Sequence, residues 1–151
     1  MFGNSIAVLS LIFSMTACAQ PHYETIQSQS QTNGSEIADC SIRFIHSQNC
    51  VSWRWEKLPT ESAPGALSFK IYRINAFDQS AVEVDPLSPP FVTLWMPDMG
   101  HGSSPTHVSR MDIGTYLAEN VFFVMPGQWE IRFQLKDQGV VNDEAIVAIT
   151  F

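Results

Sequence analysis

The chain has 151 residues, of which 45% are hydrophobic, and this is enough to fill the core of one globular domain. Its 8 basic and 15 acidic residues give a net charge of −7. The sequence contains no run of basic or of acidic residues. A basic surface that would bind nucleic acids or anionic membranes is therefore excluded. No glycine-rich loop follows a predicted strand and opens a helix, which excludes the usual nucleotide cradle. Cations are the natural small partners of such a chain.

The N-terminal segment has the pattern of a secretory signal. Residues 6–17 are apolar, a length that is short for a membrane span and typical of a signal-peptide core. Met15-Thr16-Ala17-Cys18 resembles a bacterial lipobox, in which a lipidated cysteine becomes the mature N-terminus. We predict a signal peptide over residues 1–17 and a lipid on Cys18. The alternative is an ordinary secretory signal cut near Ala19.

A polar tether follows over residues 18–39. Its Gln, Ser, Thr and Asn residues cannot bury enough apolar surface to fold. Flexible-coil scaling gives it a reach of about 25 Å. We therefore expect a domain held in the cell envelope by a lipid anchor, facing the periplasm. Ala19 is not Asp, which by analogy with lipoprotein sorting favours the outer membrane.

Two cysteines remain once Cys18 is assigned to the lipid. In an oxidising compartment, Cys40 and Cys50 are expected to pair. A disulfide here would close a short loop and contribute about 2–3 kcal/mol. The alternative, metal ligation by the two thiols, lacks the close spacing of zinc sites.

From residue 40 onward the pattern is that of β-strands. Residues 129–136 alternate apolar and polar side chains without an error, and residues 51–56 and 67–72 alternate in the same way. Turn signals bound further candidate strands at 81–84, 91–96, 107–112, 116–125 and 145–150. Short strands without a helical period predict an all-β, antiparallel sandwich of about seven to nine strands over residues 40–151.

Several motifs together resemble a known family. They are Trp53, the WMPDMGHGSSP block at 95–105, Gly114-Thr115-Tyr116 and the VMPGQW block at 124–129. In this order they look like the YtkA-like and FixH-like domains. The resemblance implies an immunoglobulin-like β-sandwich of the bacterial envelope, in some cases associated with copper handling and respiratory oxidase assembly. The lipobox-like end, in place of the transmembrane helix of FixH-type proteins, argues against the oxidase role.

The stretch from Leu94 to Pro105 carries the soft donor atoms. Pro97, Gly100 and Gly102 predict that it is a loop without regular structure. Thioether sulfur together with imidazole selects Cu(I), while harder ions prefer carboxylates. We predict a Cu(I) site in which Met99 and His101 are joined by ligands from flanking segments. The expected ligands are Met96, Met99, His101, His107 and Met125.

Each flanking ligand has a positional reason. Met96 and Met125 both precede a proline at the end of a predicted strand, and His107 begins the strand after the loop. Met111 is a weaker candidate. The alternative is that these methionines fill gaps in the core and that the loop is only a turn. Zinc is a less favoured alternative to copper, because a third His or Cys ligand is missing.

The sequence therefore predicts an envelope lipoprotein that binds Cu(I) for copper tolerance or delivery. The alternative is a non-catalytic interaction or structural module, without metal, whose partner is another envelope protein. We do not expect an enzyme, because Ser103 and Ser104 lie near His101 without a nucleophile elbow or an oxyanion hole.

Overall fold

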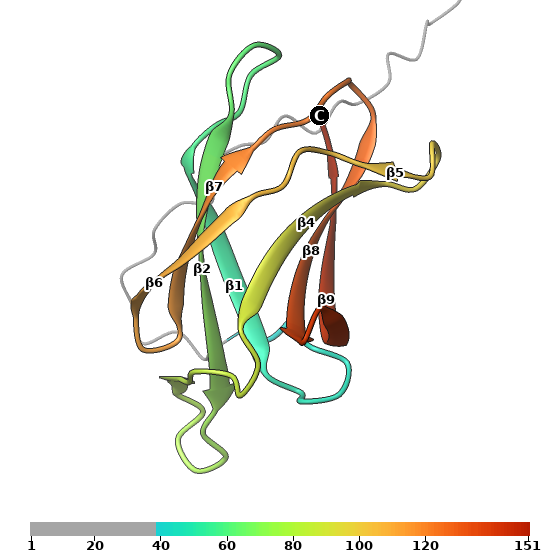
Figure 1. Cartoon of the computed structure of the whole chain (residues 1–151). Helices are drawn as coiled ribbons and strands as arrows, with labels where there is room; N and C mark the ends of the chain where they lie inside the picture. The colour runs from blue at the N-terminus through green and yellow to red at the C-terminus, as the bar shows by residue number, and fades with distance from the viewer. Residues whose placement is uncertain (1–38) are drawn as a thin grey trace, which may run out of the picture. The chain divides into compact units, whose positions relative to one another are not determined.

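A computed structural model describes residues 39–151 (Figure 1). The predicted signal peptide, Cys18 and the tether up to residue 38 lie outside the described residues. Within residues 39–151 there are nine strands and no helix. Accordingly, this part of the chain contains no helix that could cross a membrane.

The strands form two antiparallel sheets that face each other, which confirms the predicted all-β sandwich (Figure 1). The first sheet has the order β1 (Cys50–Lys57), β2 (Gly65–Ile74), β7 (Thr115–Val121), β6 (His107–Asp112), and β3 (Ala81–Glu83) also pairs with β2. The second sheet has the order β5 (His101–Gly102), β4 (Pro90–Met96), β8 (Gln128–Asp137), β9 (Val140–Thr150).

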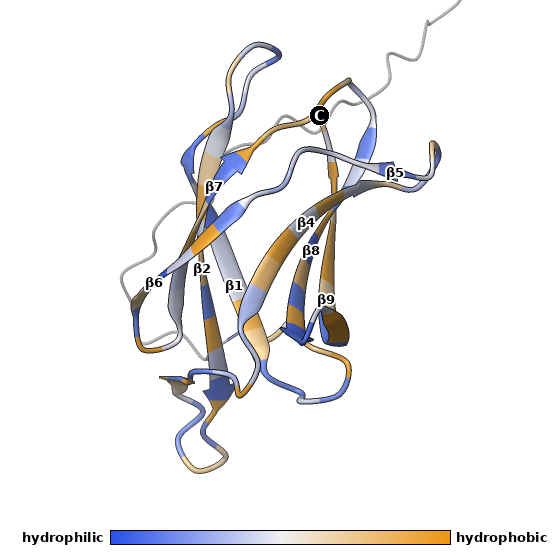
Figure 2. Cartoon of the chain, viewed as in Figure 1, coloured by the Kyte–Doolittle hydropathy of each residue, from blue (hydrophilic) through white to orange (hydrophobic). Residues whose placement is uncertain are grey.

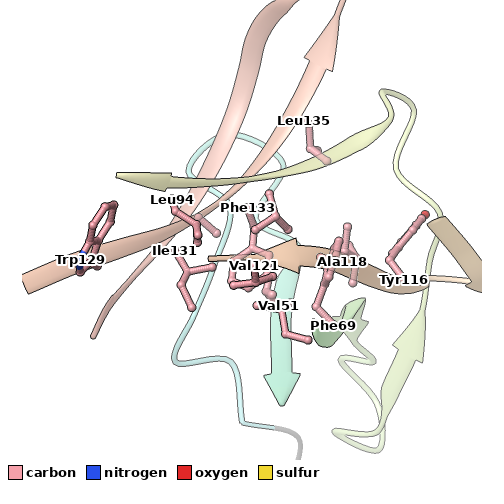
Figure 3. Packing of buried hydrophobic residues seen from close by; sticks show 14 of the residues in the cluster. Val51, Phe69, Leu94, Tyr116, Ala118, Val121, Trp129, Ile131, Phe133 and Leu135 are labelled. Atoms are coloured by element: carbon pink, nitrogen blue, oxygen red, sulfur yellow. The ribbon is translucent and has the colours of Figure 1, made fainter. Parts of the chain in front are cut away.

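The alternating strands supply the core between the sheets. The alternating apolar residues predicted to face inward on β8 and β2 are all buried; they are Trp129, Ile131, Phe133 and Leu135 on β8, and Leu67, Phe69 and Ile71 on β2. Figure 2 shows the resulting alternation of hydrophobic and polar colour along these strands. In Figure 3, Trp129 lies at one end of the cluster and Tyr116 at the other. Burying each of the larger side chains contributes about 1.5–3 kcal/mol.

The structure departs from the predicted elements mainly in three places, one of which is that β9 begins at Val140, five residues before the predicted start. The stretch after Met96 is not wholly irregular, because His101 and Gly102 form β5 against β4. The predicted strand at 116–125 ends at Val121. Asn120 there has a positive φ of 59°, and its side chain donates a hydrogen bond to the Pro105 carbonyl. Asn120 thus forms a bulge in β7, since Glu119 pairs with Ala66 and Val121 with Gly65. The strand ends one residue later, and the chain crosses to β8.

The predicted disulfide is confirmed. Cys40 and Cys50 are bonded, with their Cα atoms 5.1 Å apart. The bond fastens the start of the described chain to the first residue of β1. The Tyr72 hydroxyl, on the neighbouring strand, also donates a hydrogen bond to the Asp39 carbonyl. The chain therefore enters the sandwich at the end where β1 begins.

A buried carboxylate holds the loop between these cysteines. Asp143 of β9 accepts hydrogen bonds from the backbone N–H groups of His46 and Ser47, at 2.8 and 2.7 Å. Burial alone would raise the pKa of Asp143, but these backbone donors outweigh it and hold the pKa below its ordinary value. The charged carboxylate is thus a structural clamp between β9 and the loop.

We predict that Asp143→Asn destabilises the protein by about 1–3 kcal/mol at neutral pH, because one amide oxygen replaces two charged acceptors. The wild-type stabilisation is complete above the ordinary Asp pKa of about 3.9 and is lost as the pH falls through the lowered pKa of the folded state. Urea unfolding from pH 7 to pH 2 measures both effects. Asp137→Asn, at an exposed position of the same hairpin, is the control. Equal losses in the two variants would rule out the clamp.

Candidate metal centre

The β4–β5 hairpin places two of the predicted ligands opposite each other. Met96 and His101 are direct Cα partners in its antiparallel register. Side chains at such positions share one face of the sheet, with Cβ atoms about 4.5–5.5 Å apart. Met96 faces the core and is only 5% exposed. His101 therefore faces the interior as well, at the open end of the sandwich.

The turn of this hairpin carries Met99. The Met96 carbonyl accepts hydrogen bonds from the N–H groups of Met99 and Gly100, at 3.3 and 2.9 Å. Gly100 adopts a φ of 66°, which a residue with a Cβ rarely adopts. Met99 is 59% exposed. One thioether is thus buried below the hairpin while a second is presented to solvent above it.

One nitrogen of the His101 imidazole is engaged in a hydrogen bond. Its Nδ1 lies 3.0 Å from the Gly102 carbonyl oxygen. A carbonyl oxygen can only accept, so in the neutral ring this contact places the proton on Nδ1. The lone pair is then on Nε2, which is the form that ligates metals, and such a carbonyl contact is the usual way in which a ligating histidine is oriented.

Trp129 connects the hairpin to the loop that carries Met125. It is buried on the inner face of β8, and its ring meets the His101 ring edge to face, with centroids 6.0 Å apart. Its indole N–H donates a hydrogen bond of 3.0 Å to the Met125 carbonyl. On its other side it packs against Phe123. A single rigid side chain therefore sets the positions of His101 and of the Met125 backbone.

Gly127 lets the loop approach Met96. Any Cβ at this position would overlap the terminal methyl group of Met96. Gly127 is in turn paired with Phe151 through two backbone hydrogen bonds, at 2.8 and 3.0 Å. Met96 and Met125 thus belong to segments that contact each other. β4 and β7 lie in different sheets, and the two segments meet because the loop after β7 crosses from the first sheet to β8 in the second.

Four of the predicted ligands therefore share one end of the sandwich, and we call this set the Met/His end: Met96, Met99, His101 and Met125. The structure places the others elsewhere. His107 is exposed on β6 opposite Glu119. Its neighbour Val108 packs on the core, so His107 is on the outer face of the first sheet. Met111 is exposed at the far end of β6, and Cys40 and Cys50 are used by the disulfide.

Harder donors do not gather in the described part of the chain. Among residues 39–151, no group of three or more His, Cys, Asp or Glu side chains could hold a metal ion. Ser103, which lies close to His101 in sequence, donates its hydroxyl hydrogen to the Phe122 carbonyl and so has a structural partner. A metal at the Met/His end would depend on thioether sulfur.

Trp129 and Gly127 are the residues of this end that the sequence did not single out as part of a site. Both belong to the VMPGQW block, which supplied part of the family resemblance. Their roles depend on contacts with Met96 and His101, which are about thirty residues away in the chain. A local sequence pattern does not predict such contacts.

We predict that Trp129→Phe loosens the Met125 loop more than it changes the core. The phenyl ring keeps much of the packing but leaves the Met125 carbonyl without its donor, at a cost of about 1–3 kcal/mol. Hydrogen exchange should accelerate at residues 122–128 and at the β4–β5 turn. Trp95→Phe, on the opposite face of β4 beneath Arg132, is the matched control. Unchanged exchange in the Trp129 variant would contradict the connecting role.

Comparison with known proteins agrees with the motifs. The model of the YtkA-like family matches residues 59–134, which is half of the chain and includes every motif except Trp53. Comparison with curated proteins and with solved structures gives no match. The matched region runs from the β1–β2 connection to the middle of β8 and so contains the whole β4–β5 hairpin and the Met125 loop. On this match, the chain belongs to the YtkA-like family.

Proposed function

We propose that this protein is an envelope lipoprotein whose sandwich domain binds Cu(I) at the Met/His end, for copper tolerance or delivery. The observation that supports this most directly is the register of β4 and β5. It puts the Met96 thioether and the His101 imidazole on one face, at neighbouring positions, with Met99 in the turn between them.

The chemistry of the donor set is the second support. Thioethers are soft ligands that do not form disulfides in an oxidising compartment, and with imidazole they favour Cu(I) over harder cations. His101 has its Nδ1 occupied by the Gly102 carbonyl, which leaves Nε2 as the donor. The aromatic rings of Trp129 and Phe123 beneath the hairpin exclude water from the inner side. The hydrophobic shell of a metal site controls solvent access and so tunes the metal.

The division of the ligands between interior and surface suits a site that exchanges its metal. Met96 is held in the core, while Met99 and Met125 remain partly exposed. In our proposal the exposed thioethers meet incoming Cu(I), and Met96 and His101 complete its coordination. Lipidation at Cys18 would keep this domain in the periplasm, with the outer membrane as the favoured location.

We predict that the purified protein retains Cu(I) against a weak chromogenic chelator under anaerobic conditions. Met99→Leu, Met96→Leu and His101→Ala should each weaken binding at least about tenfold, or about 1.4 kcal/mol. The leucine changes conserve volume, so the fold is retained. His107→Ala and Met111→Leu are the controls and should bind as the wild type does. A wild-type protein that loses Cu(I) as readily as the His101 variant would exclude the site.

Stability gives an independent test. At a concentration one hundred times its dissociation constant, a ligand specific for the folded state adds about 2.7 kcal/mol. Cu(I) should therefore raise the melting temperature of the wild type. The Met99 and His101 variants, which bind at least about tenfold more weakly, should gain at most about 1.4 kcal/mol and show a smaller rise. Zn(II) should have little effect. If no metal changes the melting temperature, the alternative function remains, an anchored module that binds another envelope protein.

A further inference from the structure

The end of the sandwich opposite the Met/His end exposes large apolar side chains on three separate loops. Phe77 in the β2–β3 loop is 98% exposed, and Leu87, between β3 and β4, is fully exposed. Ile113 in the β6–β7 turn is more than half exposed. We call these three residues the apolar tips. Figure 1 shows all three loops at the end away from β5, and Figure 2 colours parts of them as hydrophobic.

These loops are held close together. The Ile71 N–H donates to the Gly114 carbonyl at 2.7 Å, and the Val84 N–H donates to the Ile71 carbonyl at 2.9 Å. Asp85 adds the central connection, since its carboxylate accepts two hydrogen bonds from Arg110 and one from the Gly114 N–H. The Tyr116 hydroxyl is a fourth donor to it. The segment carrying Leu87 is thereby fastened to the turn carrying Ile113.

The polar groups of the loops are largely satisfied within the loops themselves. The Asn75 N–H pairs with the Ser80 carbonyl, and the Asn75 side chain accepts from the Phe77 N–H. Asp78 accepts both the N–H and the hydroxyl of Ser80. The loop is therefore ordered by its own hydrogen bonds while Phe77 protrudes. Phe77 is thus presented to solvent by an ordered loop, at the same end of the sandwich as Leu87 and Ile113. Apolar side chains exposed together in this way can mark a contact surface.

The position of the chain entry indicates what lies next to this surface. Asp39 and Cys40 are tied to Tyr72 and Cys50, at the end of the sandwich where β1 begins and β2 ends. The 38 residues that precede them include the predicted lipid site at Cys18 and the predicted polar tether. The apolar tips and the point where the described chain enters the domain are therefore at the same end of the sandwich.

We propose that the apolar tips rest in the headgroup region of the bilayer that carries the lipid anchor and so orient the domain on the membrane. The charged groups of these loops are carboxylates, except for Arg110, which pairs with Asp85. Electrostatic attraction to anionic lipid is therefore absent, and the contact is apolar. The matching surface is a bilayer of zwitterionic phospholipids.

The test uses residues 18–151, the chain expected after removal of the predicted signal peptide, with a lipid supplied at Cys18. With Cys40 and Cys50 in the disulfide, Cys18 is the remaining thiol of three and can be coupled to a maleimide phospholipid in phosphatidylcholine vesicles. The result then does not depend on natural lipidation or on copper. Hydrogen exchange at residues 75–80, 86–88 and 111–114 should slow at least about threefold relative to the chain coupled to a soluble maleimide. Residues 97–100 should exchange equally in both.

Two variants complete the test. Phe77→Ser with Leu87→Ser should abolish the protection, whereas Leu58→Ser with Val124→Ser, at exposed apolar positions outside these loops, should leave it intact. These side chains are exposed, so neither change disturbs the core. Equal exchange on vesicles and in solution, or equal protection in both double variants, would overturn the proposal. The first outcome would assign the apolar tips to a protein partner instead.

Discussion

The register of β4 against its two neighbours decides what the Met/His end can do. Side chains alternate strictly across a strand, so a slip of one residue would turn Met96 and His101 outward and bring Trp95 and Gly102 inward. The core prevents that slip, because Leu94 and Val92 of the same strand are buried against Ile131 and Phe133 of β8. The free energy that positions the donor atoms therefore comes from aliphatic and aromatic packing farther along the strand.

The Met/His end consists of the β4–β5 turn and the Met125 loop, which rest on the buried side chain of Trp129. Trp129 is fixed by its strand, by Phe123 and by its hydrogen bond to the Met125 carbonyl, so it behaves as part of the scaffold. The β4–β5 turn above it is exposed at Met99 and contains Gly100 in a left-handed conformation. In the Cu(I) site that we propose, this arrangement would combine a preorganised inner ligand with outer ligands that can adjust.

Much of the fold was predictable because it follows from period-two alternation. In β8 and β2 every inward residue is apolar, so face and burial could be assigned from the sequence. β5 was missed, because a two-residue strand next to Pro97 and Gly100 has no periodicity to detect. The bulge at Asn120, just before β7 ends, depends on a positive φ that the neighbouring residues in the sequence do not reveal. Local patterns identify strands with a buried face better than they identify the points where strands stop.

The candidate site was predictable in composition but only partly in geometry. Proximity in sequence grouped Met96, Met99 and His101, and the structure places all three on the β4–β5 hairpin. His107 was grouped with them on proximity too, yet on an edge strand only Val108 shows which face is inward. The structural roles of Asp85 and Asp143 were not predicted. Their hydrogen-bond partners lie between 25 and 97 residues away, and only folding brings them together. Long-range polar contacts of this kind are set by topology.

The position of Phe151 limits what can be added after it. It pairs with Gly127 through its backbone and packs at a tilt against Phe123, with ring centroids 4.8 Å apart, so it lies beside the segment that carries Met125. A purification tag or fluorescent protein added after Phe151 would emerge next to Met96 and Met125. Histidines in such a tag would compete for the same soft cation. Labels for titrations of the proposed site therefore belong before residue 39, because the described chain enters the sandwich at the end away from Met96.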